Sequence, residues 1–276
     1  PRHPDGSYPV KSAAKAKKKA VAKDETAEQG RDAVLSALKA ALDGAGGDAE
    51  LLFISQSLDT TRFAANGIHQ NMSERDVTVS ARAAVGKKLA SVSVNSLAKG
   101  DLRAALKRAR EMASAAQPAK EWTGFSGPQT YGPAPRVDEA TARQSPVERA
   151  NVLAPLFKEA GHHGTELHGA LSARHARMAV VNTEGLEAWH EGTVADAQLI
   201  AMDPGGGGSG YAADADRRFG ALDLPTLAET AIRKCVESRN PRDLEPGTYE
   251  VILEPAAVAE IFAWLPWIAF TGRSVE

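Results

Sequence analysis

The stretch TTRFAANGIHQNMSERDVTVSARAAVGKKLASVSVN, residues 60–95, decides the fold because it is dense in β-branched and small residues. Its dipeptide Asn66-Gly67 is a strong signal for a tight hairpin turn. Val77, Val79 and Ala81 alternate with polar residues, which is the period of two expected when one face of a sheet is buried. The stretch therefore predicts an antiparallel meander of short strands at TRFAA, IHQNMS, DVTVSARAAV and KLASVSV.

Helices and further strands are predicted on both sides of the meander, from apolar spacing and from turn and capping residues. We expect helices within 26–47, over 101–116, from Ser145-Pro146, over 224–238 and from Pro255. We expect strands at 49–57, in a hairpin around residues 182–185, and at 247–254. This succession predicts an α+β fold, in which a mixed or antiparallel sheet is formed largely by the meander and the 165–203 hairpin and is packed by helices.

The 276 residues have room for one large domain or two ordinary ones. Four segments are predicted: a basic disordered arm at 1–25, a meander subdomain at 26–116, a Pro/Gly-rich connection at 117–144, and a second α/β subdomain at 145–276. Apolar residues make up 43% and charged residues 25% of the chain, which indicates a globular protein rather than a fibre or a disordered chain.

Cysteine content and hydropathy predict a cytoplasmic protein with no membrane contact. Cys235 is the only cysteine, so an intrachain disulfide is excluded and a reducing compartment is indicated. The longest apolar run, 261–270, is too short to cross a bilayer and contains Pro266. The N-terminus lacks the apolar core of a secretion signal.

The glycine-rich run DPGGGGSGY, residues 203–211, is the first candidate for a ligand site. A phosphate loop needs a helix N-terminus after the glycines and usually a Lys followed by Ser or Thr. The following AADADRRFG has no helical pattern and no lysine, so we interpret the run as a flexible turn.

His162, His163 and His168, with Glu166 between them, are a candidate metal site. Glycines at 161 and 164 interrupt any helix there, so a surface turn with exposed imidazoles is the simpler interpretation.

Cys235 lies on the apolar face of its helix and is interpreted as a packing residue. Trp122, Phe125 and Tyr131 either form a recognition patch or hold the long connection to its own domain, and we favour the second. The arm has seven Lys or Arg against one Asp within residues 1–23, but no aromatic residue is interleaved with them. The arm therefore does not favour a nucleic-acid partner.

The meander also carries a family resemblance. TRFAANGIHQNMSERDVTVSARAAVGKKLASVSVNSL resembles the N-terminal region of the TldD/PmbA family, known as modulators of DNA gyrase and including metallopeptidase subunits. The resemblance continues through AVVNTEGLEAWHEGTVADAQLIAMD, GSGYAADADRRFGALD and LEPGTYEVILEPAAVAEIF, and so covers about residues 51–276. It implies that the motif residues contact a peptide or a partner subunit; these residues are Arg62, Phe63, Asn66, His69, Gln70 and Asn71.

The same resemblance implies that this chain lacks its own metal. Catalytic members of the family have an HExxxH zinc motif on the helix that begins at the position of Pro255. The motif's His, Glu and His fall near Ala263, Trp264 and Ile268, and no histidine follows His190. Apolar side chains cannot replace imidazole ligands. The chain is thus similar to the non-metal TldE/PmbA-like members, with no catalytic residue and no cofactor of its own, and zinc is expected only in a partner subunit.

The resemblance predicts the N-terminal domain of a subunit in a cytoplasmic zinc-dependent peptidase complex that acts on extended or unfolded peptides. The partner is either an HExxxH-bearing homologue or a second copy that forms a dimer. Family members continue into a β-rich C-terminal domain, so either this is an N-terminal fragment or the apolar helix after Pro255 is an oligomer contact. The alternative is a non-catalytic regulatory protein whose basic arm contacts nucleic acid or an acidic partner.

Overall fold

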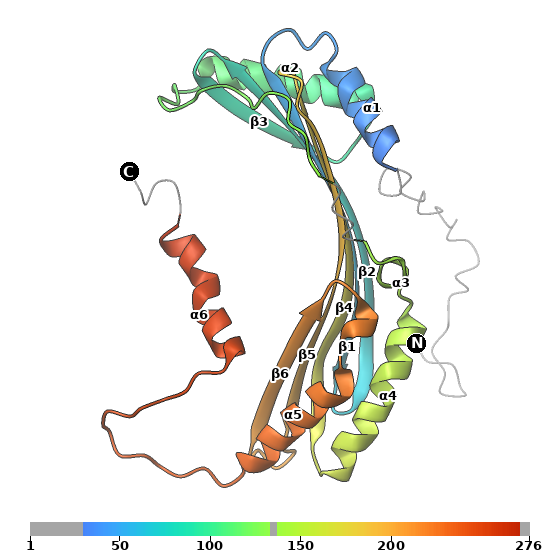
Figure 1. The fold of residues 1–276 in the computed structure, drawn as a ribbon, viewed down its shortest axis with the longest axis vertical. Helices are drawn as coiled ribbons and strands as arrows, with labels where there is room; N and C mark the ends of the chain where they lie inside the picture. Colours follow the sequence, from blue (N-terminus) through green and yellow to red (C-terminus); the bar gives the residue numbers. More distant parts are fainter. Residues whose placement is uncertain (1–29, 133–136, 271–276) are drawn as a thin grey trace, which may run out of the picture. The chain divides into compact units, whose positions relative to one another are not determined.

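The computed structural model describes residues 30–132 and 137–270 and shows an α+β fold built on one open six-stranded antiparallel sheet (Figure 1). The sheet order is β3-β2-β1-β4-β5-β6. The strands are β1 (Ala49–Ala64), β2 (Gly67–Val85), β3 (Lys88–Val94), β4 (Glu166–Asn182), β5 (Glu187–Met202) and β6 (Ser209–Asp216). The helices are α1 (Arg31–Leu42), α2 (Lys99–Ala115), α3 (Glu139–Ala142), α4 (Pro146–His162), α5 (Leu224–Glu237) and α6 (Pro255–Ile268), with a 3-10 turn at η1 (Phe219–Ala221). The predicted fold class is confirmed.

The chain divides into two compact units that interleave along the sequence. Unit 1 comprises residues 1–56, 75–132 and 177–190, and unit 2 comprises 57–74, 133–176 and 191–276. This division differs from the consecutive subdomains expected at 26–116 and 145–276, because β1, β2, β4 and β5 each contribute residues to both units. The basic arm at 1–25 lies outside the described residues.

In unit 1, α1 and α2 pack against the sheet through one apolar cluster. The alternation predicted at residues 77–81 is confirmed, since Val77, Val79 and Ala81 are all buried. Helix α1 contributes Val34, Leu35 and Leu38 to the same cluster. The strand face with a period of two and the helix face with a period near four therefore meet in one core.

The connection after α2 is held to unit 1 by polar and aromatic contacts. Trp122 and Phe125 pack edge to face at 5.0 Å, and the guanidinium of Arg82 lies 6.0 Å and 5.5 Å from their ring centroids. Asn182 Nδ2 donates to the carbonyl of Ser126 at 2.9 Å. Tyr131 is 53% exposed. Two of the three aromatic residues thus anchor the connection to its own unit, as the favoured interpretation expects.

In unit 2, α4 and α5 pack on the sheet through a second apolar cluster that includes Leu156, Leu171, Leu199 and Ile232. The predicted start of α4 is confirmed in detail. Ser145 Oγ accepts from the Glu148 amide at 3.2 Å, Glu148 Oε2 accepts from the Ser145 amide at 2.7 Å, and Pro146 occupies the first turn.

Several strand predictions need correction. Residues 49–64 form one continuous strand, β1, instead of separate strands at 49–57 and TRFAA. Residues 67–85 form one continuous strand, β2, instead of two. Residues 247–254 are not a strand: they are exposed, irregular backbone, and their apolar side chains have no sheet to pack on among the described residues. Strand β6 was not predicted, because SGYAADAD is poor in the residues that favour strands.

Candidate functional site

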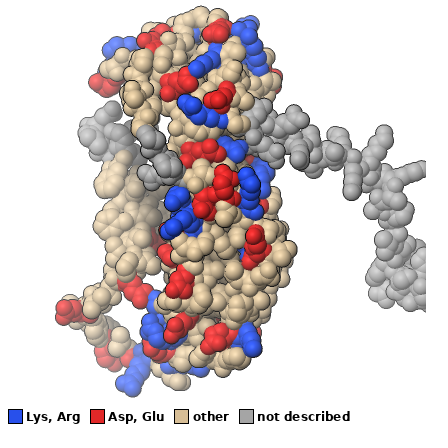
Figure 2. Space-filling view, turned by 45° about the vertical axis from the view of Figure 1, so that its right-hand side comes forward, with Lys and Arg blue, Asp and Glu red and all other residues tan. Residues whose placement is uncertain are grey.

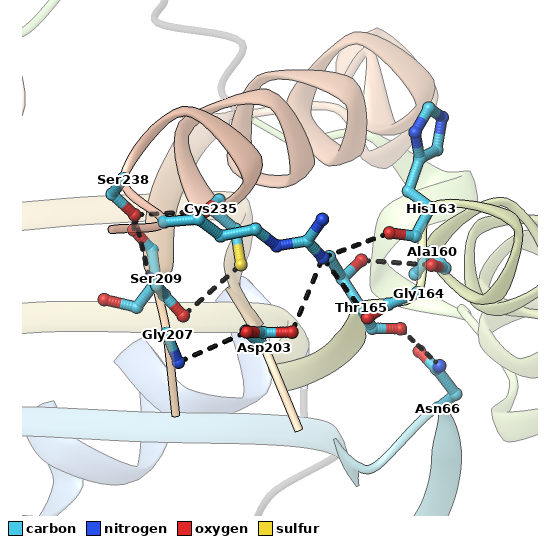
Figure 3. Close-up of polar contacts among 12 residues, drawn as sticks. Asn66, Ala160, His163, Gly164, Thr165, Asp203, Gly207, Ser209, Cys235 and Ser238 are labelled. Atoms are coloured by element: carbon cyan, nitrogen blue, oxygen red, sulfur yellow. Dashed lines mark hydrogen bonds and ion pairs between the residues drawn. The ribbon is translucent and has the colours of Figure 1, made fainter. Parts of the chain in front are cut away.

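The tip of the β1–β2 hairpin carries the family-motif residues, and two of them are structural. The turn is centred on Ala65 and Asn66, both with positive φ (49° and 56°), one residue earlier than the predicted Asn66-Gly67. Asn66 tolerates this conformation and adds contacts to the start of β4. Its Nδ2 donates to the Thr165 carbonyl at 3.0 Å (Figure 3), and its Oδ1 accepts from the Leu167 amide at 2.7 Å. Asn66 therefore fastens the hairpin tip to β4.

Phe63 is the second structural member of the motif. It is 2% exposed, and its ring lies 5.4 Å from that of Phe157 on α4. It also lies over Gly169 of β4, where a Cβ would be 3.0 Å from Phe63 Cζ and would overlap the Gln198 carbonyl oxygen. The absence of a side chain at Gly169, whose φ is +148°, is thus what lets the aromatic ring pack there.

The other motif residues, Arg62, His69, Gln70 and Asn71, are exposed. Asn71 alone among them has a described side-chain partner, because Thr61 Oγ1 donates to its Oδ1 at 2.6 Å. Thr61 in turn accepts from Arg149 Nε at 2.8 Å, and both Thr61 and Arg149 are 0% exposed. Arg149 was not singled out from the sequence, where it reads as an ordinary polar position of a helix.

The motif strand also has a free edge. Strand β3 pairs only with residues 79–85 of β2. Residues 67–78 of β2 therefore have β1 on one side and no described strand on the other. A free edge presents backbone donors and acceptors that can pair with an added strand.

The glycine-rich run is the turn between β5 and β6, and its last two glycines, Gly208 and Gly210, serve packing. A Cβ on Gly208 would overlap the Cys235 carbonyl oxygen and lie 2.8 Å from Ser238 Oγ, and a Cβ on Gly210 would lie 2.6 Å from the Cys235 amide nitrogen. Asp203 Oδ2 accepts from the Gly207 amide at 3.2 Å (Figure 3). The run allows α5 to approach the start of β6 closely. It is followed by strand β6 and not by the helix N-terminus that a phosphate loop needs.

An arginine joins this turn to the end of α4. Arg239 Nη2 donates to the carbonyl oxygens of His163 at 3.2 Å and Gly164 at 3.4 Å, and lies 3.5 Å from Asp203 Oδ1. Ser238 Oγ accepts from the Ser209 amide at 3.0 Å (Figure 3). The hairpin tip, the α4–β4 connection and the β5–β6 turn are thus linked by hydrogen bonds at one end of unit 2.

The candidate metal histidines face two different carboxylates and do not converge on one point. His162 and His163 face Glu159 of α4 at 3.6 Å and 3.2 Å, whereas His168 on β4 faces Glu166 at 3.7 Å. Across residues 30–132 and 137–270, no group of three or more His, Cys, Asp or Glu side chains has an arrangement that could hold a metal ion. The arrangement matches a surface with exposed imidazoles.

Cys235 is fully buried and its thiol lies 3.4 Å from the Gly208 carbonyl oxygen. Burial raises the pKa of the Cys235 thiol, while Arg239 lowers it by a smaller amount. The side chain therefore packs as a neutral thiol, as predicted.

A groove of about 1120 Å³ runs along unit 2 between α4 and α5. Its floor is apolar, with Leu156, Leu222 and Ile232, and its rim carries Glu159, Glu229 and Arg233. Such a groove has the size of a ligand or peptide site, but it holds no convergent set of catalytic side chains.

Helix α6 carries the positions, Ala263, Trp264 and Ile268, at which the resemblance would place the family's zinc motif. Trp264 is 59% exposed and Ile268 is 71% exposed, and Ala263 is exposed as well. None of these side chains has an atom that coordinates zinc, so the residues do not fit the metal that the family implies. In the part of the chain that is described, no helix combines the length and the apolar character that a bilayer crossing needs.

Fold and site together define an α+β domain with a long motif hairpin and a free strand edge. Residues 49–113 match the model of the PmbA/TldA metallopeptidase domain 1. This match covers less than half of the chain and agrees with the resemblance to the TldD/PmbA family seen in the sequence.

Solved structures show the same fold. TldE from Thermococcus kodakarensis is similar with a TM-score of 0.66 and 20% identity, over 73% of this chain and 46% of that one. A Bacteroides thetaiotaomicron protein described as a candidate modulator of DNA gyrase is similar with a TM-score of 0.73 and 14% identity, over 88% and 57%. A Thermotoga maritima protein of the same description has a TM-score of 0.62 and 15% identity, over 78% and 50%. The chain thus spans about half the length of these relatives. No curated protein sequence matches it.

Proposed function

We propose that the chain is the N-terminal domain of a TldE/PmbA-like subunit, which works in a cytoplasmic zinc-dependent peptidase complex and has no zinc site of its own. The observation that carries the proposal is the side-chain set at the family's motif positions. Ala263, Trp264 and Ile268 offer a divalent cation no imidazole nitrogen, thiolate sulfur or carboxylate oxygen, and the indole N–H of Trp264 is a donor only. A subunit with this set contributes structure and substrate surface, and its HExxxH-bearing partner contributes the metal.

The proposed substrate is an extended or unfolded peptide. A peptide bond must be accessible before water can attack its carbonyl group, and folded proteins hide most of theirs. The free edge of β2 at residues 67–78 supports this substrate class, because an extended peptide can add to it as a strand. Motif side chains that are exposed on the same segment, among them His69 and Gln70, would contact the added peptide.

The test is reconstitution with a family member that carries HExxxH. The chain alone, the partner alone and the mixture are assayed for zinc by mass spectrometry and for cleavage of a fluorogenic unstructured peptide. We expect zinc and turnover to follow the partner, and turnover to rise several-fold in the mixture. A matched control is the partner with its first motif histidine changed to alanine, which should abolish turnover in the mixture.

A second experiment introduces the zinc motif into this chain and asks whether the missing donors explain the absence of a metal site. The triple substitution A263H, W264E and I268H supplies the missing donors, and the wild-type chain is its control. The proposal is refuted if the wild-type chain, purified without a partner, holds one equivalent of zinc and cleaves the peptide.

A second candidate function is regulatory binding through the basic arm. It is favoured by the seven Lys or Arg within residues 1–23 and by the gyrase-modulator description of two structural relatives. On the face shown in Figure 2, Lys and Arg lie interspersed with Asp and Glu, so this face adds no extended basic patch. Steeply salt-dependent DNA binding that disappears when residues 1–23 are deleted would favour this function over the peptidase role.

A further inference from the structure

Arg149 is a charged residue in the interior of unit 2. It is 0% exposed, and its contacts are few: Nε donates to Thr61 Oγ1 at 2.8 Å and Nη1 donates to the Gln144 carbonyl at 3.1 Å. Its Nη2 is buried and has no hydrogen-bond partner among the described residues. Burial lowers the pKa of Arg149, and the charges of Asp59 and Glu148 partly offset this.

A buried guanidinium is a poor way to stabilise a fold. Removing a cation from water costs several kcal/mol, and an apolar side chain of similar volume is often equal or better for stability. The contacts of Arg149 therefore point to a role in orientation. One of those contacts connects Arg149 to the family motif, because its partner Thr61 is hydrogen-bonded to the motif residue Asn71.

The hydrogen bonds in the structure orient Asn71: Thr61 Oγ1 can accept two hydrogen bonds and donate one, and its one donation goes to Asn71 Oδ1. An arginine side chain can only donate, so Thr61 Oγ1 must accept from Arg149 Nε. A hydroxyl has one hydrogen, and Thr61 donates it to Asn71 Oδ1 at 2.6 Å. The amide oxygen of Asn71 is thereby held inward, and the Nδ2 group, with two hydrogens, is left on the exposed side.

We propose that Arg149 is a positioning residue that acts through Thr61 to hold the Asn71 amide as a hydrogen-bond donor for a peptide carbonyl. The inference rests on the proposed function for its ligand and deepens it. Asn71 lies within the free-edge segment 67–78 of β2, where a peptide added as a strand would pass. Its exposed Nδ2 group can donate to a backbone carbonyl oxygen of an extended peptide. Because every residue has such a carbonyl, this hydrogen bond does not depend on the peptide's sequence.

The positioning step is tested by NMR on the whole chain, without any ligand. The side-chain amide signals of Asn71 are assigned by their loss in N71D, and their order parameter and hydrogen exchange are measured. We expect an ordered amide in the wild type and in T61S, which keeps the hydroxyl. We expect a mobile amide in T61V and in R149M, although backbone signals away from the site are unchanged.

An Asn71 amide that is equally ordered in T61V and wild type overturns the positioning role. T61S guards against a general loss of folding, because it differs from T61V in the hydroxyl that the mechanism needs. R149M tests whether the arginine is needed to hold Thr61, and an Asn71 amide that stays ordered in R149M would also overturn the positioning role.

The ligand step is tested separately with fluorescein-labelled oxidised insulin B chain, an extended peptide, by fluorescence anisotropy. Loss of one oriented hydrogen bond should weaken binding about three- to tenfold in T61V and R149M, with T61S close to wild type. N71D, which replaces the donor with a carboxylate, should weaken it further. Unchanged binding by N71D overturns the donor assignment. If the wild type does not bind the peptide while the NMR result holds, the proposed peptide surface fails and the positioning role of Arg149 stands.

Discussion

Replacing Gly210 by alanine tests whether the glycine-rich run exists for packing. A Cβ at this position would lie 2.6 Å from the Cys235 amide nitrogen and 2.7 Å from Lys234 Cβ, and it would overlap the carbonyl oxygen of Ala231. Two of these neighbours are backbone atoms of α5, so no side-chain rotation relieves them. Helix α5 would have to move by roughly 1 Å to restore ordinary contact distances.

That movement is opposed by the core of unit 2, because Ala228, Ala231, Ile232 and Cys235 of α5 are all buried. Overpacking of this kind costs typically 1–3 kcal/mol, and contacts with rigid backbone place Gly210→Ala near about 3 kcal/mol. For a chain of this size, such a loss lowers the melting temperature by about 6–12 °C.

The assay is thermal unfolding followed by circular dichroism, with Gly205→Ala as the matched control from the same run. At Gly205 the nearest atom to a new Cβ is Asp203 Oδ2 at 3.6 Å, an ordinary contact. We expect the control to melt within a degree or two of the wild type, since a tolerated Gly→Ala change is neutral or slightly stabilising. Equal melting temperatures for the two variants would refute the packing explanation of the glycines.

Three further changes test other contacts. Asn66→Ala removes two hydrogen bonds at the hairpin tip and should lower the free energy of unfolding, measured in urea, by about 2–3 kcal/mol. The control His69→Ala changes an exposed side chain and should alter this free energy by less than about 0.5 kcal/mol. Equal effects would contradict the division into structural and exposed motif residues. Burial raises the pKa of Asp196, with Arg174 and Ser172 opposing, so the stability contributed by its neutral form is lost as pH rises through that pKa. Asp196→Asn should therefore gain stability relative to wild type as urea unfolding is repeated from acidic toward neutral pH, and a constant difference would count against it. Native Cys235 should react with iodoacetamide far more slowly than the urea-unfolded chain at mildly alkaline pH, because its thiol is buried and its pKa is raised; equally fast reaction would show an accessible thiolate.

Local patterns predicted those parts of the fold that local chemistry determines. The alternation at residues 77–81 and the helix start at Ser145-Pro146 both depend on neighbours close in sequence, and both are confirmed. The segment 247–254 has a strand-like composition, but a strand needs a pairing partner and the described residues give it none. Strand β6 is the opposite case. Its sequence has weak strand propensity, but it forms a strand because it pairs with β5 and packs closely on α5.

The candidate site was predicted unevenly for a similar reason. The motif residues were found by resemblance, but the separation of Phe63 and Asn66, which make tertiary contacts, from exposed His69 and Gln70 required the tertiary structure. Arg149 gave no sequence signal, since its burial depends on a contact with Thr61, 88 residues away. The roles of the exposed motif residues remain predictions that the experiments above address.

The open border of β2 has a consequence for how the protein behaves in concentrated solution. An unpaired strand border invites the same border of a neighbouring molecule, which is a common route to aggregation. Glu74, Arg75 and Asp76 are exposed on this segment, and side chains with alternating charge disfavour the flat, close contact that such pairing requires. These charged side chains thus disfavour stacking of identical molecules along the border without covering its backbone groups.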